Sequence, residues 1–137
     1  LSEKAAEIRL INRNKKRSTD LSQEFSSRIR IYDWSDNETA IKGATTLVNC
    51  TSLGTLNNQP FPHEFKGAHP KAVGVDLVYN PMETSFMKNA AKENIKCING
   101  LDMLVYQARP GFIEWFKNKP AYTKDLRLLL IKSLRGF

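Results

Sequence analysis

Residues 8–17 have the sequence IRLINRNKKR, an apolar stretch that ends directly in a basic run. The apolar part, Ile8–Asn12, is typical of a β-strand, and the segment from Lys15 to Ser26 carries Leu21 and Phe25 at helical spacing. A strand followed at once by a helix is the unit from which parallel α/β sheets are built. This stretch therefore indicates the fold class, and the rest of the chain repeats its pattern.

Four further apolar runs alternate with helix-like or loop segments. The expected strands are Arg28–Tyr32, Thr45–Cys50, Ala72–Leu77 and Lys96–Ile98, and the expected helices are Thr84–Asn94, Leu101–Phe116 and Thr123–Leu134. The first of these strands alternates with period two, which indicates one wet face, whereas the next two are typical of buried strands. The loop from Leu53 to about Pro70 is long, and such loops are often functional or mobile. The sequence predicts an α/β fold with mostly parallel strands joined by right-handed crossovers.

The composition is that of one globular domain, with 137 residues, 41% hydrophobic and 26% charged. No run of about 18 apolar residues occurs, and the charged first residues do not resemble a secretory signal, so no membrane partner is expected. Cys50 and Cys97 lack CxxC spacing and are expected to be small core residues in a reducing cytoplasm. A disulfide or a metal site is the alternative, although zinc is not expected in a chain with only two histidines.

The chain has 21 lysine and arginine residues and 14 aspartate and glutamate residues, which gives a net charge of +7. This charge favours an anionic partner: a nucleic acid, a phosphorylated cofactor or an acidic surface. Outside Arg13–Arg17 the basic residues are spread along the chain, and no nucleic-acid motif or aromatic stacking array is present. We therefore expect no nucleic-acid partner, and a basic, non-enzymatic binding module remains the alternative.

The basic run Arg13–Arg17 lies where a parallel α/β sheet binds ligands, at the carboxyl end of a strand. In dinucleotide-binding folds an acidic residue at such an end holds the ribose of NAD, whereas arginine accommodates the additional phosphate of NADP. Guanidinium suits this task because its planar fork donates charge-assisted hydrogen bonds to phosphate oxygens. Cations at a helix N-terminus oppose the helix dipole by roughly 0.3–1 kcal/mol each, which favours a bound anion over a merely solvated helix start.

Three other strand ends carry polar residues. The segment Asn49–Gly54 is either an ordinary turn or a site where the backbone approaches a ligand. The segment Asp76–Pro81 places Tyr79 just beyond the end of a strand, where its side chain either packs against the protein or presents its hydroxyl to a ligand. Asn99–Gln107 starts a helix after Gly100, with unpaired N–H groups in its first turn.

Together the four strings resemble the shikimate dehydrogenase and quinate/shikimate dehydrogenase family, in the right order and spacing. The resemblance covers essentially the whole chain and implies an incomplete Rossmann-like, three-layer parallel sheet that binds NADP. It implies that the 2′-phosphate is held by Asn12, Arg13, Asn14 and Arg17, and that the cofactor cleft and nicotinamide are bordered by Thr51, Ser52, Leu77, Gly100 and Met103. It also implies that Tyr79 and Gln107 contact the small-molecule substrate, shikimate or 3-dehydroshikimate.

The family reaction is hydride transfer between NADPH and 3-dehydroshikimate, in aromatic biosynthesis, and quinate is the alternative substrate. Asn14 replaces the more usual threonine, and Asp102 stands where glycine is common. The resemblance implies that residues 1–137 form one C-terminal NADP-binding domain, which includes the two helices at the C-terminal end. It implies no catalytic residue within this sequence. The catalytic lysine and aspartate belong to an N-terminal domain, the expected partner, and the glycine-rich loop would precede Leu1–Ala6, near the end of the first helix.

In the Rossmann strand order 3-2-1-4-5-6, the strand for which this sequence has no counterpart is strand 1, at the centre of the sheet. The strands at Ile8 and Arg28 would then have no neighbour in the half built from Thr45, Ala72 and Lys96. Two unpaired strand edges would remain, and exposed edges invite wrong pairing. We expect this stretch to fold poorly alone, as part of a longer parent chain or as the remnant of a broken reading frame.

Overall fold

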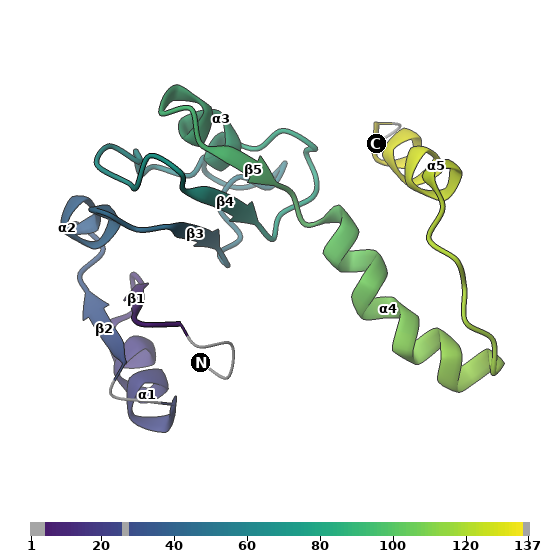
Figure 1. Cartoon of the computed structure of the whole chain (residues 1–137), viewed down its shortest axis with the longest axis horizontal. Coiled ribbons are helices and arrows are strands. Elements are labelled where there is room, and N and C mark those ends of the chain that lie inside the picture. Colours follow the sequence, from purple (N-terminus) through teal and green to yellow (C-terminus); the bar gives the residue numbers. More distant parts are fainter. Residues whose placement is uncertain (1–4, 26–27, 136–137) are drawn as a thin grey trace. The chain divides into compact units, whose positions relative to one another are not determined.

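The computed structural model describes residues 5–25 and 28–135, and it divides into two compact units. Unit 1 comprises Leu1–Ala44 and Phe65–His69, and unit 2 comprises Thr45–Glu64 and Pro70–Phe137. Figure 1 shows the elements of each unit along the chain.

Unit 1 is a strand–helix–strand unit followed by a short helix. Its elements are β1 (Ile8–Ile11), α1 (Lys15–Phe25), β2 (Ile29–Tyr32) and α2 (Asn37–Ile41). β1 and β2 are parallel, as the intervening helix requires, with Ile8 opposite Ile29. The Arg9 guanidinium donates to the carbonyl oxygens of Ala40 (3.0 Å) and Lys42 (2.6 Å), which ties the end of α2 to β1.

Unit 2 contains a parallel sheet of three strands and three helices. Its elements are β3 (Thr46–Asn49), β4 (Val73–Asp76), α3 (Ser85–Lys92), β5 (Lys96–Ile98), α4 (Leu101–Phe116) and α5 (Lys124–Arg135). The strand order is β3-β4-β5. In the register of the sheet Asn49 lies opposite Asp76, so two polar residues meet at the carboxyl ends of β3 and β4.

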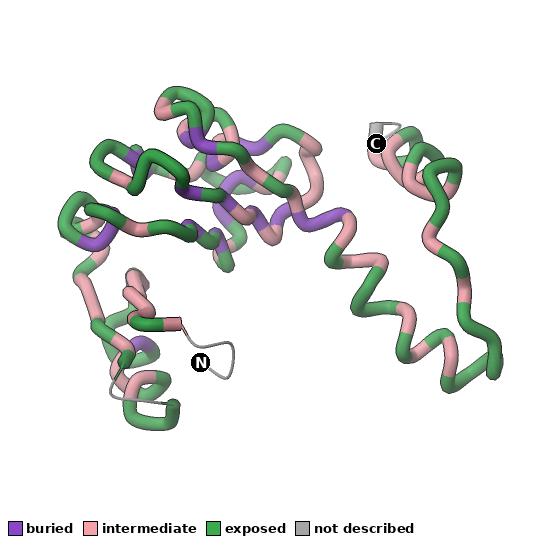
Figure 2. Tube along the Cα trace, viewed as in Figure 1, coloured by how far each residue is buried: buried purple, intermediate pink, exposed green. Residues whose placement is uncertain are grey.

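The core of unit 2 forms where α3 packs against the sheet, and the buried residues of Figure 2 gather around these strands. α3 is amphipathic, and its Phe86 and Ala90 are 1% and 0% exposed. Thr84 begins the helix, since its hydroxyl accepts the Met87 N–H at 3.2 Å. Gly74 makes the close packing possible, because a Cβ there would lie 2.3 Å from Cys97 Sγ and 3.2 Å from Phe86 Cε1.

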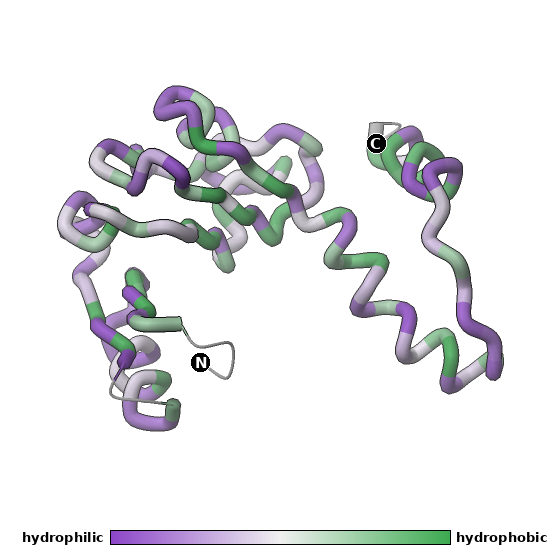
Figure 3. The backbone as a smooth tube through the Cα atoms, in the orientation of Figure 1, coloured by the Kyte–Doolittle hydropathy of each residue, from purple (hydrophilic) through white to green (hydrophobic). Residues whose placement is uncertain are grey.

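The predicted alternation of strands and helices is confirmed, and each expected element is present with ends within one or two residues of the prediction. Helix α2 was not predicted, because its five residues are too few to show a period. Figure 3 shows hydrophobic and hydrophilic residues interchanging along α4 and α5. Of the predicted first-helix end at Leu1–Ala6, residues 1–4 lie outside the described residues and residues 5–6 are not helical. Ser26 also lies outside them.

The predictions of two buried strands and of a buried Cys50 were wrong. Residues Thr45–Cys50 do not form a wholly buried strand, because β3 alternates exposed and buried residues and Val48 is 53% exposed. Residues Ala72–Leu77 are not wholly buried either, because Val73 of β4 is 39% exposed. Val48, Val73 and Ile98 lie on one face of the sheet, and the described residues leave this face largely uncovered. Cys50 is exposed, because it follows the buried Asn49 and so faces the other way, whereas Cys97 is half-buried.

The strands divide between two sheets as the Rossmann order predicts. In residues 5–25 and 28–135, β1 pairs with β2, and β3-β4-β5 form a separate sheet. This is the division expected when the strand that would lie between β1 and β3 is not among them. The parallel α/β class is therefore confirmed.

Candidate functional site

The basic run of unit 1 lies at the carboxyl end of β1 and in the first turn of α1. Asn12 Oδ1 accepts the Asn14 N–H at 2.9 Å, and Asn14 Oδ1 accepts the Arg17 N–H at 3.3 Å. These side chains occupy N–H groups that a helix start otherwise offers to an anion. An anion here would therefore be held mainly by the side chains of the exposed cations, which include Arg13 and Arg17.

The end of β2 contributes two partners to this basic run. Lys15 Nζ lies 3.0 Å from Asp33 Oδ1, and the Arg13 guanidinium lies 5.8 Å from the centroid of the Trp34 ring. Both pairs join a residue that follows β1 to one that follows β2, because parallel neighbours end at the same edge. Asp33 is thus neutralised locally, and the positive potential of this edge is kept.

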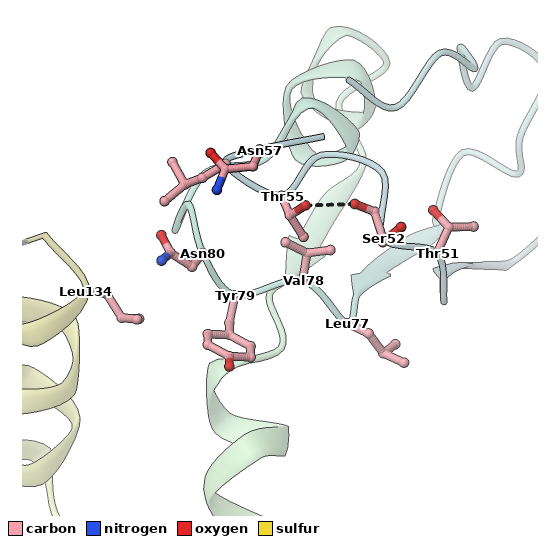
Figure 4. Close-up of a pocket in the computed structure, with 10 residues that line it drawn as sticks. Thr51, Ser52, Thr55, Asn57, Leu77, Val78, Tyr79, Asn80 and Leu134 are labelled. Atoms are coloured by element: carbon pink, nitrogen blue, oxygen red, sulfur yellow. Dashed lines mark hydrogen bonds between the residues drawn. The ribbon is translucent and has the colours of Figure 1, made fainter. Parts of the chain in front are cut away.

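Unit 2 carries an open pocket of about 540 Å³. Figure 4 shows its walls, which come from the turn after β3, the loop after β4 and one residue of α5. The lining residues are Thr51, Ser52, Thr55, Leu56, Asn57, Leu77, Val78, Tyr79, Asn80 and Leu134. Four residues selected from the sequence, Thr51, Ser52, Leu77 and Tyr79, therefore share one pocket at the carboxyl ends of β3 and β4, the edge where α/β sheets bind ligands.

A buried hydrogen-bond network shapes this pocket. Asp76, Asn49 and Thr84 are 0%, 1% and 0% exposed. Asp76 accepts from Asn49 Nδ2 at 2.9 Å, from the Thr84 hydroxyl at 2.5 Å and from the Val78 N–H at 3.0 Å. These donors stabilise a carboxylate that burial would otherwise make costly.

Asn49 extends the network into the turn that carries the predicted site residues. Its Oδ1 accepts from the Thr51 N–H (3.0 Å) and the Thr51 hydroxyl (2.7 Å), and its Nδ2 also donates to the Leu53 carbonyl (3.3 Å). Sequence reasoning did not select Asn49 or Asp76 as site residues. The available signal was a polar residue at the last position of two adjacent buried strands.

Gly100 and Leu77, both selected from the sequence, lie against one another. A Cβ on Gly100 would lie 2.0 Å from the Leu77 carbonyl oxygen, and the Gly100 N–H donates to the Val78 carbonyl at 3.2 Å. Met103 and Gln107 share one face of α4, four residues apart, and both are exposed. They are not among the residues that line the pocket, and their roles remain predictions.

Asp102 in the first turn of α4 anchors the segment that leads into α5. Tyr122 donates its hydroxyl hydrogen to Asp102 Oδ1, and Arg127 Nε lies 3.1 Å from the same oxygen. The Tyr122 hydrogen bond, with help from Arg127, holds the pKa of Asp102 below its usual value. Partial burial, then the Asp102 carboxylate, raises the pKa of Tyr122.

Both cysteines are free thiols. Partial desolvation of the sulfur, followed by the nearby Asp76, raises the pKa of the half-buried Cys97, and it does the same for Cys50 although that residue is exposed overall. Over the residues that the structure describes, no three side chains of His, Cys, Asp or Glu gather as metal ligands. None of the described helices is both long and apolar enough to cross a membrane.

The parallel sheets, with polar residues and a pocket at the carboxyl ends of their strands, define a Rossmann-like α/β protein. Comparison with known proteins agrees, although no protein-family model matches the chain. The chain is 37% identical over 127 residues to the shikimate dehydrogenase (NADP(+)) of Cereibacter sphaeroides, an alignment that spans 93% of this chain and 46% of that protein. It spans about half the length of the curated relatives it matches.

Solved structures give the same result. Shikimate dehydrogenase from Aquifex aeolicus matches with a TM-score of 0.74 and 28% identity, over 89% of this chain and 44% of that one. Shikimate 5-dehydrogenase from Thermus thermophilus, solved with NADP(H) and shikimate, matches with a TM-score of 0.67 and 29% identity, over 88% of this chain and 44% of that one. The chain is similar to the shikimate dehydrogenases over about half of their length.

Proposed function

We propose that this chain is the NADP-binding part of a shikimate dehydrogenase, which reduces 3-dehydroshikimate to shikimate with NADPH. The observation that carries the proposal is the exposed basic run at the carboxyl end of β1, where Arg13 and Arg17 flank a helix start whose N–H groups are partly occupied by asparagine side chains. Such an arrangement selects a phosphate through side-chain charge. The homology to proteins named for NADP(+) supports this cofactor.

In this proposal the bound NADPH supplies the hydride, and the residues of the chain bind and orient the reactants. Asn12, Arg13, Asn14 and Arg17 hold the 2′-phosphate. Thr51 and Ser52 line the cofactor cleft, on a turn that Asn49 holds in place.

The nicotinamide side of the proposal belongs to unit 2. Leu77 and Gly100, in contact with each other, border the nicotinamide, and Met103 packs near its ring. Tyr79, in the pocket, and Gln107, on α4, contact the substrate.

The proposal assigns the catalytic lysine and aspartate to an N-terminal domain outside the residues that this chain shares with its relatives. It follows that these 137 residues without that domain do not catalyse the reaction. Quinate remains the alternative substrate, because the residues proposed to contact substrate suit either compound.

Cofactor binding tests the proposal. Isothermal titration calorimetry of the chain should show tighter binding of NADP than of NAD, and Arg13→Ala with Arg17→Ala should abolish that preference. Lys88→Ala with Lys92→Ala, on α3, is the matched control because it removes the same two charges elsewhere. Equal affinity of the parent chain for both cofactors would contradict the phosphate-binding role.

A further inference from the structure

Trp34 and Arg13 form a pair at the edge where β1 and β2 end. Arg13 follows β1 and Trp34 follows β2, and the guanidinium carbon lies 5.8 Å from the centroid of the indole ring, within cation–π range. Trp34 is half-buried, so its ring is held by the protein while part of its surface remains accessible. A partly exposed indole beside an exposed, planar cation is a surface on which another flat aromatic group can stack.

The charges around the pair select the kind of aromatic ligand. Asp33 precedes Trp34 and could repel an anion, but Lys15 lies 3.0 Å from its carboxylate. The neighbouring Lys16 and Arg17 are exposed. An indole surface bordered by cations suits a ligand that joins a flat base to phosphate, as a phosphorylated nucleoside does.

We propose that Trp34 is the platform on which the adenine base of the cofactor stacks, an inference that rests on the proposed function. Arg13 has a long, flexible side chain, and it moves off the indole by the thickness of the base and covers the other face of the adenine. Trp34 is therefore a positioning residue for the base. It contributes to the affinity for every adenine nucleotide, whereas Arg17 contributes to the choice of NADP over NAD.

Tryptophan fluorescence provides a direct test, because the chain has two tryptophans, Trp34 and Trp115. Trp115 is 80% exposed on α4, so Trp115→Phe leaves Trp34 as the reporter without disturbing a core. In this background adenosine 2′,5′-bisphosphate should quench the emission saturably. Inorganic pyrophosphate and nicotinamide mononucleotide, which lack adenine, should not.

Calorimetry of Trp34 variants gives an independent measurement. Aromatic stacking of a base predicts that Trp34→Leu weakens binding of adenosine 2′,5′-bisphosphate about 10-fold, whereas Trp34→Phe retains affinity within about 3-fold. The affinity ratio between this ligand and adenosine 5′-monophosphate should stay unchanged in Trp34→Leu and fall in Arg17→Ala. Far-UV circular dichroism establishes that each variant is folded.

The outcomes separate this inference from the proposed function. If the parent chain binds adenosine 2′,5′-bisphosphate but Trp34→Leu binds it equally well, the platform is wrong and the proposed function stands. Binding by the Trp115→Phe chain without any change in Trp34 emission would also overturn the platform, even if Trp34→Leu does not fold. If the parent chain binds no adenine nucleotide, the proposed function and the platform fail together.

Discussion

At the scale of single residues, two glycines are required by close packing. Gly100 abuts the backbone of Leu77, where a Cβ would lie 2.0 Å from the carbonyl oxygen. Gly74 abuts the side chain of Cys97, where the corresponding distance is 2.3 Å. A side chain can be shortened by mutation but a backbone carbonyl cannot, so a second substitution can relieve the clash at Gly74 but not the one at Gly100.

We predict that Gly100→Ala and Gly74→Ala each lower the free energy of unfolding by about 1–3 kcal/mol through overpacking. Adding Cys97→Ala should restore part of the stability in Gly74→Ala, because it removes the sulfur that the new methyl group meets. Urea denaturation measures both effects. Gly111→Ala in α4 is the control, since an added Cβ there would meet nothing within 4 Å beyond its chain neighbours and the backbone of its own helix. Better helix propensity should raise stability by about 0.5–1 kcal/mol.

Asp76 is the residue on which the walls of the pocket depend, and Thr84 is one of its donors. Thr84→Val keeps the shape of the side chain but removes the hydroxyl that donates to Asp76 and caps α3. We expect a loss of about 1–3 kcal/mol in the free energy of unfolding from the missing donor to a buried carboxylate. Thr84→Ser keeps the hydroxyl and should lose much less, and equal losses in both variants would refute this role.

At the scale of elements, α4 and the segment into α5 are joined by the Asp102 cluster. Tyr122 and Arg127 both contact this carboxylate, and the Tyr122 ring packs edge-on against Tyr106 at 5.6 Å. The Asp102 pKa is lower in the folded chain than its ordinary value. The cluster therefore contributes its full stability at pH values above that ordinary value, and the contribution is lost as the pH falls through the lowered pKa.

Tyr122→Phe should raise the pKa of Asp102 toward its ordinary value, because the largest of the interactions that lower it is removed. The cluster would then lose its stabilising effect at a higher pH than in the parent chain. Titration of the Asp102 carboxyl carbon by NMR measures the shift. Tyr106→Phe, which keeps the ring packing and the Tyr122 hydroxyl, should leave it unchanged, and a shift of equal size in both variants would contradict this assignment.

At the scale of the whole molecule, the strands that the structure describes are divided between a two-stranded and a three-stranded sheet. An isolated pair of strands is marginal in water, and a unit as small as Leu1–Ala44 with Phe65–His69 buries little apolar surface. Unit 2 has the better core, with Phe86, Ala90 and Leu101 at 1% exposure or less. Stability should therefore differ between the two units.

We predict that the backbone amides of β1 and β2 exchange with solvent faster than those of β3, β4 and β5, because local opening depends on local packing. Phe86→Ala removes a large buried side chain from the core of unit 2. It should accelerate amide exchange in β3, β4 and β5 and leave the exchange rates of β1 and β2 unchanged. Hydrogen exchange followed by NMR measures each strand. A uniform acceleration over both sheets would show that the chain unfolds as one cooperative unit.

The local features of this protein were determined by the sequence alone. The sequence predicted the alternation of strands and helices, the basic run Arg13–Arg17 directly after β1, and the start of α4 after Gly100. Each of these depends on residues close together in the chain. The division into two sheets was also predictable, since it follows from which strands of the Rossmann order are present.

Only the tertiary structure decided which distant side chains meet. Asn49 and Asp76, 27 residues apart, become partners through the register of β3 and β4, and Trp34 meets Arg13 because β1 and β2 end at one edge. The exposure of Cys50 and of one face of β3 likewise depends on which neighbours the sheet supplies. Register and cover arise from packing between segments far apart in the chain, so local periodicity alone does not decide either.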